Sequence, residues 1–254
     1  MLFQDKVCLA VDITDLAKAQ AVARDFRSCT RTVKLGPALC AAQGPMGIRS
    51  FYSLGMSEVI LDLRLCGRAW EMRTAISAIL SIRGTAGVTV QACSGRESMS
   101  AALQTAAGSI LRTNTIKPPK VLATLSPSTL TDAELAADHC ISGGRREYVQ
   151  TTVRWCREIG VHGVIVDYYD IQAAKEACPD MPLLANAKRG VATRLASIPA
   201  SQRKLPGVGS VIRAGACHAF FDAVLVARQD HDWAADTLQK EMKSTGIWSG
   251  HGSP

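Results

Sequence analysis

Residues 7–12 read VCLAVD, and residues 58–64 read EVILDLR. Both are short, continuous apolar runs that meet charged residues at or near their ends. Such runs, about five to seven residues long, are typical of strands buried on both faces of a parallel sheet. Similar runs recur along the chain, and we expect eight strands: Val7–Asp12, Thr32–Gly36, Glu58–Arg64, Gly87–Ala92, Lys120–Leu125, Gly163–Asp167, Pro182–Asn186 and Asp222–Arg228.

Segments with helical periodicity separate these runs. The clearest is Asp15–Phe26, where Asp15 is a candidate N-cap and apolar residues recur at intervals of three and four. A capping-box pattern at Thr131–Glu134 predicts the start of another helix. Further helices are expected over Ala69–Ile82, Arg96–Ala107, Arg145–Ile159, Ile171–Ala177 and Ala234–Lys243.

The alternation of strands and helices predicts the fold class. Eight strand–helix repeats in 254 residues are typical of an α/β protein with a (β/α)8 TIM barrel in a single domain. A doubly wound sheet is the alternative. It is disfavoured because no Gly-x-Gly-x-x-Gly motif follows the first strand, and Gly207-Val208-Gly209 lacks the third glycine. We expect the barrel to occupy residues 1–248 and the last residues, 249–254, to form a flexible tail.

Composition narrows the class of protein. The chain is 47% hydrophobic and 20% charged, which suits a large folded core and excludes a disordered protein. It contains no apolar stretch of 18 residues, so we expect no membrane span. The first residues lack the pattern of a secretory signal, and the nine cysteines are scattered without any Cys-x-x-Cys pair. We therefore expect free thiols and a cytoplasmic protein.

The charge balance indicates an anionic partner. Lys and Arg outnumber Asp and Glu by 29 to 22, for a net charge of +7. The basic residues form no run of five, and only 5% of the chain is aromatic, so nucleic acid is a poor match. A small phosphorylated ligand fits the charge better.

Charged side chains stand near the carboxyl ends of the predicted strands, where TIM barrels carry their active sites. Asp12 closes the first strand, and Lys34 lies within the second between apolar neighbours, where a buried lysine needs a partner. Asp62 and Arg64 are two residues apart and should point to the same face of the third strand. The pattern predicts a charged array at the barrel mouth, with a purely structural ion pair as the alternative.

A basic segment follows the seventh predicted strand. Residues 186–204 contain five Lys or Arg residues and no acidic residue, and Arg228 ends the eighth predicted strand. The loops after strands seven and eight are the usual phosphate site of barrels. The segment therefore indicates phosphate binding, with a solvated basic loop as the alternative.

Several of these segments together resemble a known family. Val7–Asp12, Thr32–Gly36 and Ile60–Arg64 resemble the first three strands of orotidine 5'-phosphate decarboxylases. Asp222–Arg228 is similar to that family's last strand with its phosphate-binding arginine, and Ser201-Gln202-Arg203 is similar to its Asp-Gln-Arg segment. The resemblance extends in order from about residue 7 to residue 243.

The resemblance implies a role for individual residues, and it shows two departures. The family has an alternating Lys, Asp, Lys, Asp array, of which Lys34 and Asp62 match the first two members. Arg64 stands where the family has its second lysine, and Gly67 stands where it has its last aspartate. Carried over by position, the catalytic residues are Lys34, Asp62 and Arg64, and the substrate-binding residues are Asp12 for sugar or base, Ser128 for the pyrimidine edge, and Gln202 and Arg228 for phosphate.

The resemblance implies a decarboxylase-type lyase that acts on a nucleotide monophosphate as a homodimer. No metal or other cofactor is expected, because the predicted strand ends offer no cluster of His or carboxylate ligands. Nucleic acid and membrane are not expected partners. Because Arg64 and Gly67 alter the array, two alternatives stay open. One is a relative with a changed reaction in a specialised nucleoside pathway, and the other is a nucleotide-binding relative without catalysis.

Overall fold

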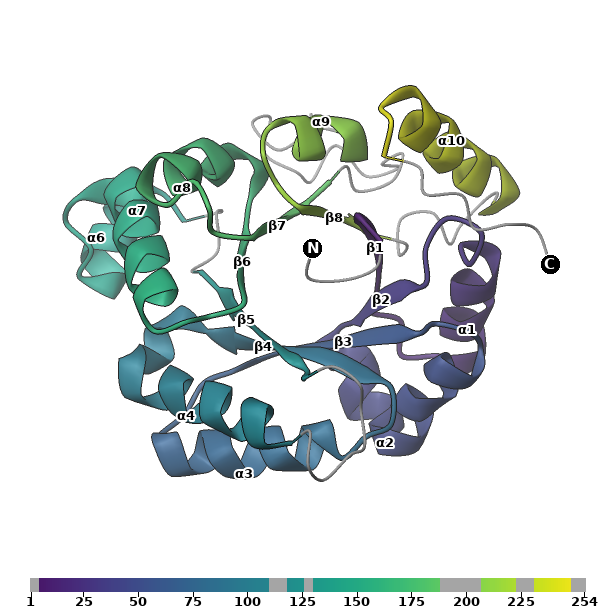
Figure 1. Cartoon of the computed structure of the whole chain (residues 1–254), viewed down its shortest axis with the longest axis horizontal. Helices are drawn as coiled ribbons and strands as arrows, with labels where there is room; N and C mark the ends of the chain where they lie inside the picture. Colours follow the sequence, from purple (N-terminus) through teal and green to yellow (C-terminus); the bar gives the residue numbers. More distant parts are fainter. Residues whose placement is uncertain (1–4, 110–117, 126–129, 188–206, 223–230, 248–254) are drawn as a thin grey trace.

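The computed structural model of the chain describes residues 5–109, 118–125, 130–187, 207–222 and 231–247. Its strands form one closed barrel in which every neighbouring pair is parallel and the first strand pairs with the last (Figure 1). The predicted single-domain TIM barrel is confirmed, and the doubly wound alternative is excluded. The strands are β1 (Val7–Val11), β2 (Thr32–Leu35), β3 (Glu58–Leu65), β4 (Thr85–Gln91), β5 (Lys120–Thr124), β6 (Gly163–Val166), β7 (Leu183–Asn186) and β8 (His218–Asp222).

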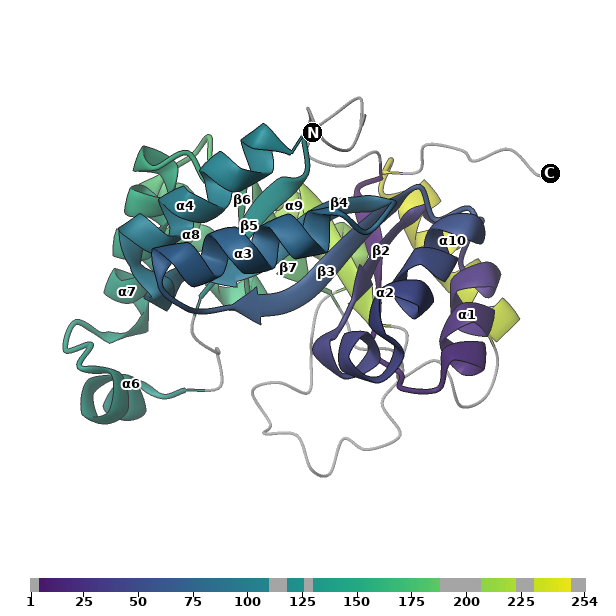
Figure 2. The same cartoon turned by 90° about the horizontal axis from the view of Figure 1, so that it is seen from below.

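Helices surround the barrel, and Figure 2 shows α3 and α4 side by side along its outside. The described helices are α1 (Leu16–Asp25), α2 (Pro37–Ser53), α3 (Ala69–Leu80), α4 (Gly95–Gly108), α6 (Asp132–His139), α7 (Gly144–Glu158), α8 (Ile171–Ala177), α9 (Val208–Arg213) and α10 (His231–Ser244), with short 3-10 turns η1 (Ala92–Ser94) and η2 (Tyr168–Asp170). Within the described residues, none of the helices is both long enough and apolar enough to cross a membrane.

The caps predicted from the sequence are present. Asp15 accepts a hydrogen bond from the Lys18 backbone N–H at 3.1 Å and begins α1. Thr131 and Glu134 cap one another at the start of α6. These bonds satisfy amide groups that have no partner within the helix, which fixes where each helix begins.

Helix α2 is absent from the sequence-based prediction. Pro37 begins it, and Gly44 and Pro45 interrupt it, so the segment reads as a loop. In the structure Gly44 has φ 59° and forms a kink, and helical geometry resumes at Pro45. Helix α9, a short segment after Gly207, was also not predicted.

The last strand was placed wrongly. We expected it over Asp222–Arg228, but β8 ends at Asp222, and residues 223–228 lie outside the described part of the chain. His218 made the true strand look polar. Its side chain is fully buried, and its Nδ1–H donates to the Asp5 carbonyl at 2.8 Å. A buried polar group with a partner is compatible with a core strand.

The buried imidazole predicts a pH-dependent stability. Burial lowers the pKa of His218 from 6.5 to about 4. The unfolded chain therefore binds a proton below about pH 6.5 that the folded chain does not bind until about pH 4. The contribution of neutral His218 to the free energy of unfolding is fully present above pH 6.5. It is lost as the pH falls towards 4, which lowers the free energy of unfolding by about 3 kcal/mol.

Urea unfolding at a series of pH values measures this effect. His218→Gln should remove most of the added slope between pH 6.5 and 4. His139→Gln, at an exposed position, is the matched control and should leave the slope unchanged. Equal slopes in wild type and His218→Gln would contradict the prediction.

The barrel interior is packed rather than open. Cys8, Ile60, Leu122 and Leu184 come from β1, β3, β5 and β7 and form one buried cluster with Phe220. Layers of side chains from alternate strands are the usual filling of a TIM barrel. On β3, the side chain two residues beyond Ile60 is Asp62, so the charged groups begin where this apolar cluster ends.

Candidate active site

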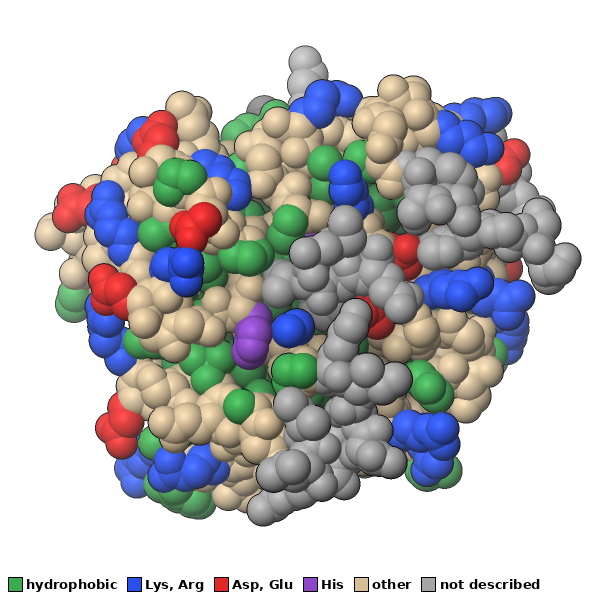
Figure 3. Space-filling model, viewed as in Figure 1, with side chains coloured by type: hydrophobic (Ala, Val, Ile, Leu, Met, Phe, Trp, Pro, Cys, Tyr) green, Lys and Arg blue, Asp and Glu red, His purple; other side chains and the backbone are tan. Residues whose placement is uncertain are grey.

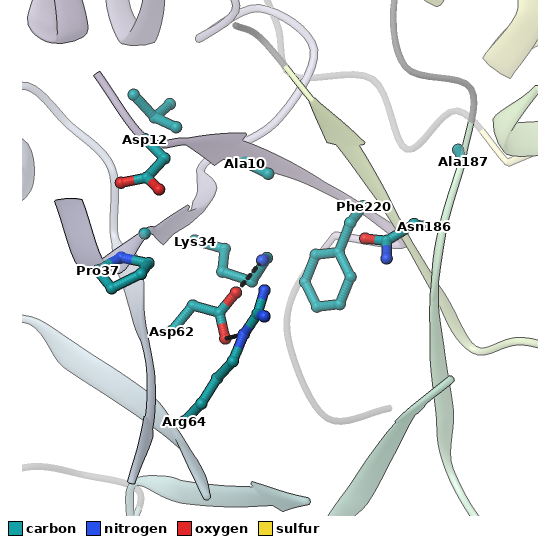
Figure 4. Close-up of a pocket in the computed structure, with 11 residues that line it drawn as sticks. Ala10, Asp12, Lys34, Pro37, Asp62, Arg64, Asn186, Ala187 and Phe220 are labelled. Atoms are coloured by element: carbon teal, nitrogen blue, oxygen red, sulfur yellow. Dashed lines mark hydrogen bonds and ion pairs between the residues drawn. The ribbon is translucent and has the colours of Figure 1, made fainter. Parts of the chain in front are cut away.

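A cavity of about 230 Å³ opens at the carboxyl ends of the strands. Figure 4 shows Lys34, Asp62 and Arg64 converging on one side of it, with Phe220 and Asn186 on the other. β1, β2, β3, β7 and β8 or the residues that follow them provide the lining. The lining residues are Ala10, Val11, Asp12, Lys34, Gly36, Pro37, Asp62, Arg64, Asn186, Ala187 and Phe220.

Asp62 is the centre of the charged groups. Its side chain is 4% exposed, and each of its oxygens meets a cation. Lys34 Nζ forms an ion pair with Oδ2, and Arg64 Nε lies 3.5 Å from Oδ1. The three residues predicted to form an array are therefore brought together. Lys34 Nζ also lies 4.9 Å from the centre of the Phe220 ring, a cation–π contact.

The ionisation of Asp62 reflects two opposing influences. Burial raises the pKa of its carboxyl group, but the charge and hydrogen bond of Lys34 and the charge of Arg64 lower it further than burial raises it. The net result is a pKa below the usual range of aspartate. At neutral pH the site therefore holds a buried carboxylate between two cations.

A bulge in β3 directs Arg64. Between the pairs Leu61–Val88 and Leu65–Val90, β3 contains more residues than β4, so the register shifts. Arg64 lies in this irregularity with φ 47°, a conformation that side chains other than glycine rarely adopt. Bulges next to active sites commonly re-aim a side chain. Arg64 thus shares the cavity with Asp62 through a bulge, not through the regular alternation that the sequence spacing suggests.

Thr89 on β4 was not identified from the sequence. Its hydroxyl donates to Asp62 Oδ1 at 2.9 Å and accepts from the Arg64 backbone N–H at 2.8 Å. The sequence does contain a hint of this role, because Thr89 is a polar residue within the apolar run of residues 87–92. It is easily overlooked because threonine is an ordinary strand residue.

Asp12 lies at the rim of the cavity, near the start of α2. Its Oδ1 accepts a hydrogen bond from the Leu39 backbone N–H at 2.9 Å. Gly36 allows this approach, since a Cβ atom there would lie 2.2 Å from Asp12 Cγ. The structure gives Asp12 a capping contact, and its predicted role in binding sugar or base stays a prediction.

The remaining predicted contacts fall elsewhere. Ser128, Gln202 and Arg228 lie outside the described residues, as does nearly all of the basic segment at 186–204. Phe220 and Asn186 line the cavity and were not among the predicted site residues. Phe220 was missed because the last strand was placed too late in the chain. Among the described residues, no three His, Cys, Asp or Glu side chains gather as a metal site would require.

Comparison with known proteins identifies the family. The sequence model described as "Orotidine 5'-phosphate decarboxylase / HUMPS family" matches residues 5–214. The orotidine 5'-phosphate decarboxylase of Moorella thermoacetica is 25% identical over 244 residues, which cover 94% of this chain and 93% of that protein. The enzyme of the same name from Anaeromyxobacter sp. strain K is 28% identical over 235 residues, covering 90% and 92%.

A solved structure has the same architecture. The crystal structure of orotidine 5'-phosphate decarboxylase from Lactobacillus acidophilus superposes with a TM-score of 0.74 at 16% identity, covering 94% of this chain and 99% of that chain. This likeness shows the shared barrel fold. The sequence match covers far more than half of the chain, and it includes β1, β2 and β3 with their charged residues. The chain therefore belongs to the orotidine 5'-phosphate decarboxylase / HUMPS family.

Proposed function

We propose that this protein is a carboxy-lyase that removes carbon dioxide from orotidine 5'-phosphate or a closely related pyrimidine nucleotide monophosphate. The family and the relatives at about 25% identity indicate the enzyme class. The observation that carries the proposal is the buried Asp62 carboxylate held between Lys34 and Arg64 in the cavity.

The charges suit the electronic demand of decarboxylation. When the bond to the carboxyl carbon breaks, carbon dioxide leaves and the electron pair stays on the ring carbon, which must then accept a proton. Cations fixed in a water-poor site stabilise such developing negative charge. Lys34 and Arg64 supply those cations, while Asp62 holds them in place and repels a substrate carboxylate placed beside it.

The identity of residue 64 predicts a slow reaction. Arginine has a pKa well above that of lysine and is a poor proton donor at neutral pH. Its guanidinium can stabilise charge, but it releases a proton to the ring carbon with difficulty. We therefore expect low turnover.

Recognition of the rest of the substrate is also proposed. The basic segment at 186–204 with Gln202, together with Arg228, would bind the phosphate, Asp12 the sugar or base, and Ser128 the pyrimidine edge. Among the coloured side chains on the face seen in Figure 3, which belong to the described part of the chain, acidic and basic residues are interspersed. We further propose a homodimer, as the family resemblance implies.

One observation favours a second function. The three array members present, two cations and one carboxylate, carry a net positive charge because Gly67 occupies the position of the last aspartate. The Lys, Asp, Lys, Asp array of the family has two positive and two negative members and therefore no net charge. A family member with a changed reaction on a phosphorylated substrate is therefore the second candidate.

The deciding experiment incubates concentrated protein with orotidine 5'-phosphate for hours and follows uridine 5'-phosphate by mass spectrometry. Product is expected with the wild type and absent with Lys34→Ala. Lys18→Ala is the matched control, because Lys18 is an exposed lysine on α1, and it should retain activity. Absence of product from the wild type at every substrate concentration would reject the decarboxylase assignment.

A further inference from the structure

One hydroxyl group connects the two halves of the charged array. Thr89 is fully buried on β4, and its Oγ1 lies 2.9 Å from Asp62 Oδ1 and 2.8 Å from the Arg64 backbone nitrogen. A hydroxyl has one proton to donate and lone pairs to accept. Because the carboxylate can only accept and the N–H can only donate, both functions of this hydroxyl are used.

Each of these bonds acts on a feature that needs support. Asp62 is buried, and its charged form is stabilised by every hydrogen bond that it accepts. Arg64 holds φ 47° in the bulge of β3, a conformation that persists only where neighbouring groups fix it. The bond from the Arg64 N–H to Thr89 fixes the backbone at that residue.

We propose that Thr89 is a positioning residue, which orients the Asp62 carboxylate and holds the Arg64 bulge so that both side chains face the same cavity. The inference rests on the proposed function for its effect on turnover. Its structural part is independent of that function. Thr89 is not among the cavity-lining residues, so it acts through Asp62 and Arg64 and not on the substrate.

Packing alone does not require this hydroxyl. Valine is β-branched like threonine and suits a strand, so it could fill the volume at position 89 of β4 without any polar atom. Val88 and Val90, which point to the opposite face of β4, are fully buried valines, so this strand accepts valine on either side of position 89. A hydroxyl at this point is thus explained by its two hydrogen bonds.

The test compares Thr89→Val with Thr89→Ser. The first removes the hydroxyl and keeps the shape, and the second keeps the hydroxyl. Thr85→Val is the matched control: Thr85 is buried on the same strand, and its hydroxyl donates to the Ile82 carbonyl at 2.8 Å, away from Asp62. The turnover of Thr89→Val should fall about ten- to a hundredfold, the effect of losing a hydrogen bond to a charged group. Thr89→Ser and Thr85→Val should stay near wild type.

A second readout needs no activity. The Asp62 carboxyl carbon can be titrated by carbon-13 NMR, and its pKa should rise in Thr89→Val and stay at the wild-type position in Thr89→Ser. None of the variants changes a charged or ionisable group near Asp62. Lys34 and Arg64 lower the pKa of Asp62, and the thiols of Cys8 and Cys40 respond to its charge. A shift in the pKa of Asp62 therefore reports on the Thr89 hydroxyl.

The outcomes separate this inference from the proposed function. If the wild type proves inactive on orotidine 5'-phosphate, the titration still decides whether Thr89 sets the state of Asp62. An unshifted Asp62 pKa in Thr89→Val would overturn the inference. So would a Thr89→Ser variant with a shifted pKa, and this second result applies even if Thr89→Val does not fold.

Discussion

Asp62→Ala is expected to abolish product formation and to lower the free energy of unfolding by about 3–5 kcal/mol. The loss of stability has a specific cause. The Lys34 side chain is only 12% exposed, and removing its partner leaves an ammonium group buried without a counter-charge. Thr89 loses the acceptor for its hydroxyl at the same time. Urea unfolding at neutral pH measures the change.

A double variant distinguishes the lost partner from the lost contacts. Replacing both members of a buried ion pair by apolar residues commonly restores stability, so Lys34→Met with Asp62→Leu should recover most of the stability that Asp62→Ala loses, while still being inactive. Asp180→Ala is the matched single control, since Asp180 pairs with Arg157 on the surface, and it should have a much smaller effect. If Asp62→Ala unfolds at the same urea concentration as wild type, the Lys34–Asp62 ion pair does not stabilise the fold in the way proposed.

Protonation of Asp62 in acid should lower the free energy of unfolding gradually, as Asp62→Ala does in one step. Because the folded-state pKa of Asp62 lies below that of an unfolded aspartate, its stabilising contribution is present above the unfolded value. The contribution is lost as the pH falls through the lower, folded value. The loss of stability from Asp62 is therefore expected at lower pH than the loss from His218, which takes place between pH 6.5 and about 4.

The fold was predictable because burial on both faces leaves a simple pattern. Strands in this barrel contact the helices on one side and the packed interior on the other, so most of their residues are apolar. The prediction failed where that rule is broken locally. His218 is polar yet satisfied inside the barrel, which moved the expected strand to the next apolar run. Pro37 and Gly44 concealed α2, since one begins the helix and the other kinks it.

The site was only partly predictable for a related reason. Lys34, Asp62 and Arg64 were identified because charge within a buried strand requires a partner. The bulge that directs Arg64 could not be predicted, since the rule of alternating faces assumes a regular strand. Thr89 could not be identified from the sequence because its role depends on its hydrogen bonds to Asp62 and to the Arg64 backbone. Only the folded chain brings β4 next to the bulge in β3.

Arg64→Lys is expected to raise the rate of decarboxylation about a hundred- to a thousandfold. The pKa of lysine is roughly two to three units below that of arginine. At about 1.36 kcal/mol per unit, proton transfer from residue 64 to the ring carbon becomes easier by roughly 3–4 kcal/mol. Initial rates of uridine 5'-phosphate formation measure the change. Arg96→Lys on α4, an exposed arginine paired with Glu158, is the matched control and should have no effect.

The second departure from the family array needs a local adjustment before it can be tested. A Cβ atom on Gly67 would lie 3.0 Å from Glu71 Oε2, which accepts a hydrogen bond from the Arg68 backbone N–H at 2.6 Å. Gly67→Asp would therefore place two carboxylates together at the start of α3. We expect it to be tolerated best with Glu71→Gln, which keeps an acceptor for the cap and removes the like charge.

The combined results then decide between the two proposed functions. A slow wild type that Arg64→Lys accelerates is a decarboxylase whose proton transfer is limited by arginine. A wild type without measurable turnover that becomes a decarboxylase only with Arg64→Lys, or with Gly67→Asp added, retains the barrel and the Lys34–Asp62 pair but performs a different reaction in its natural form. An unchanged rate in Arg64→Lys would show that residue 64 does not donate the limiting proton, because the difference in acidity is too large to leave no trace.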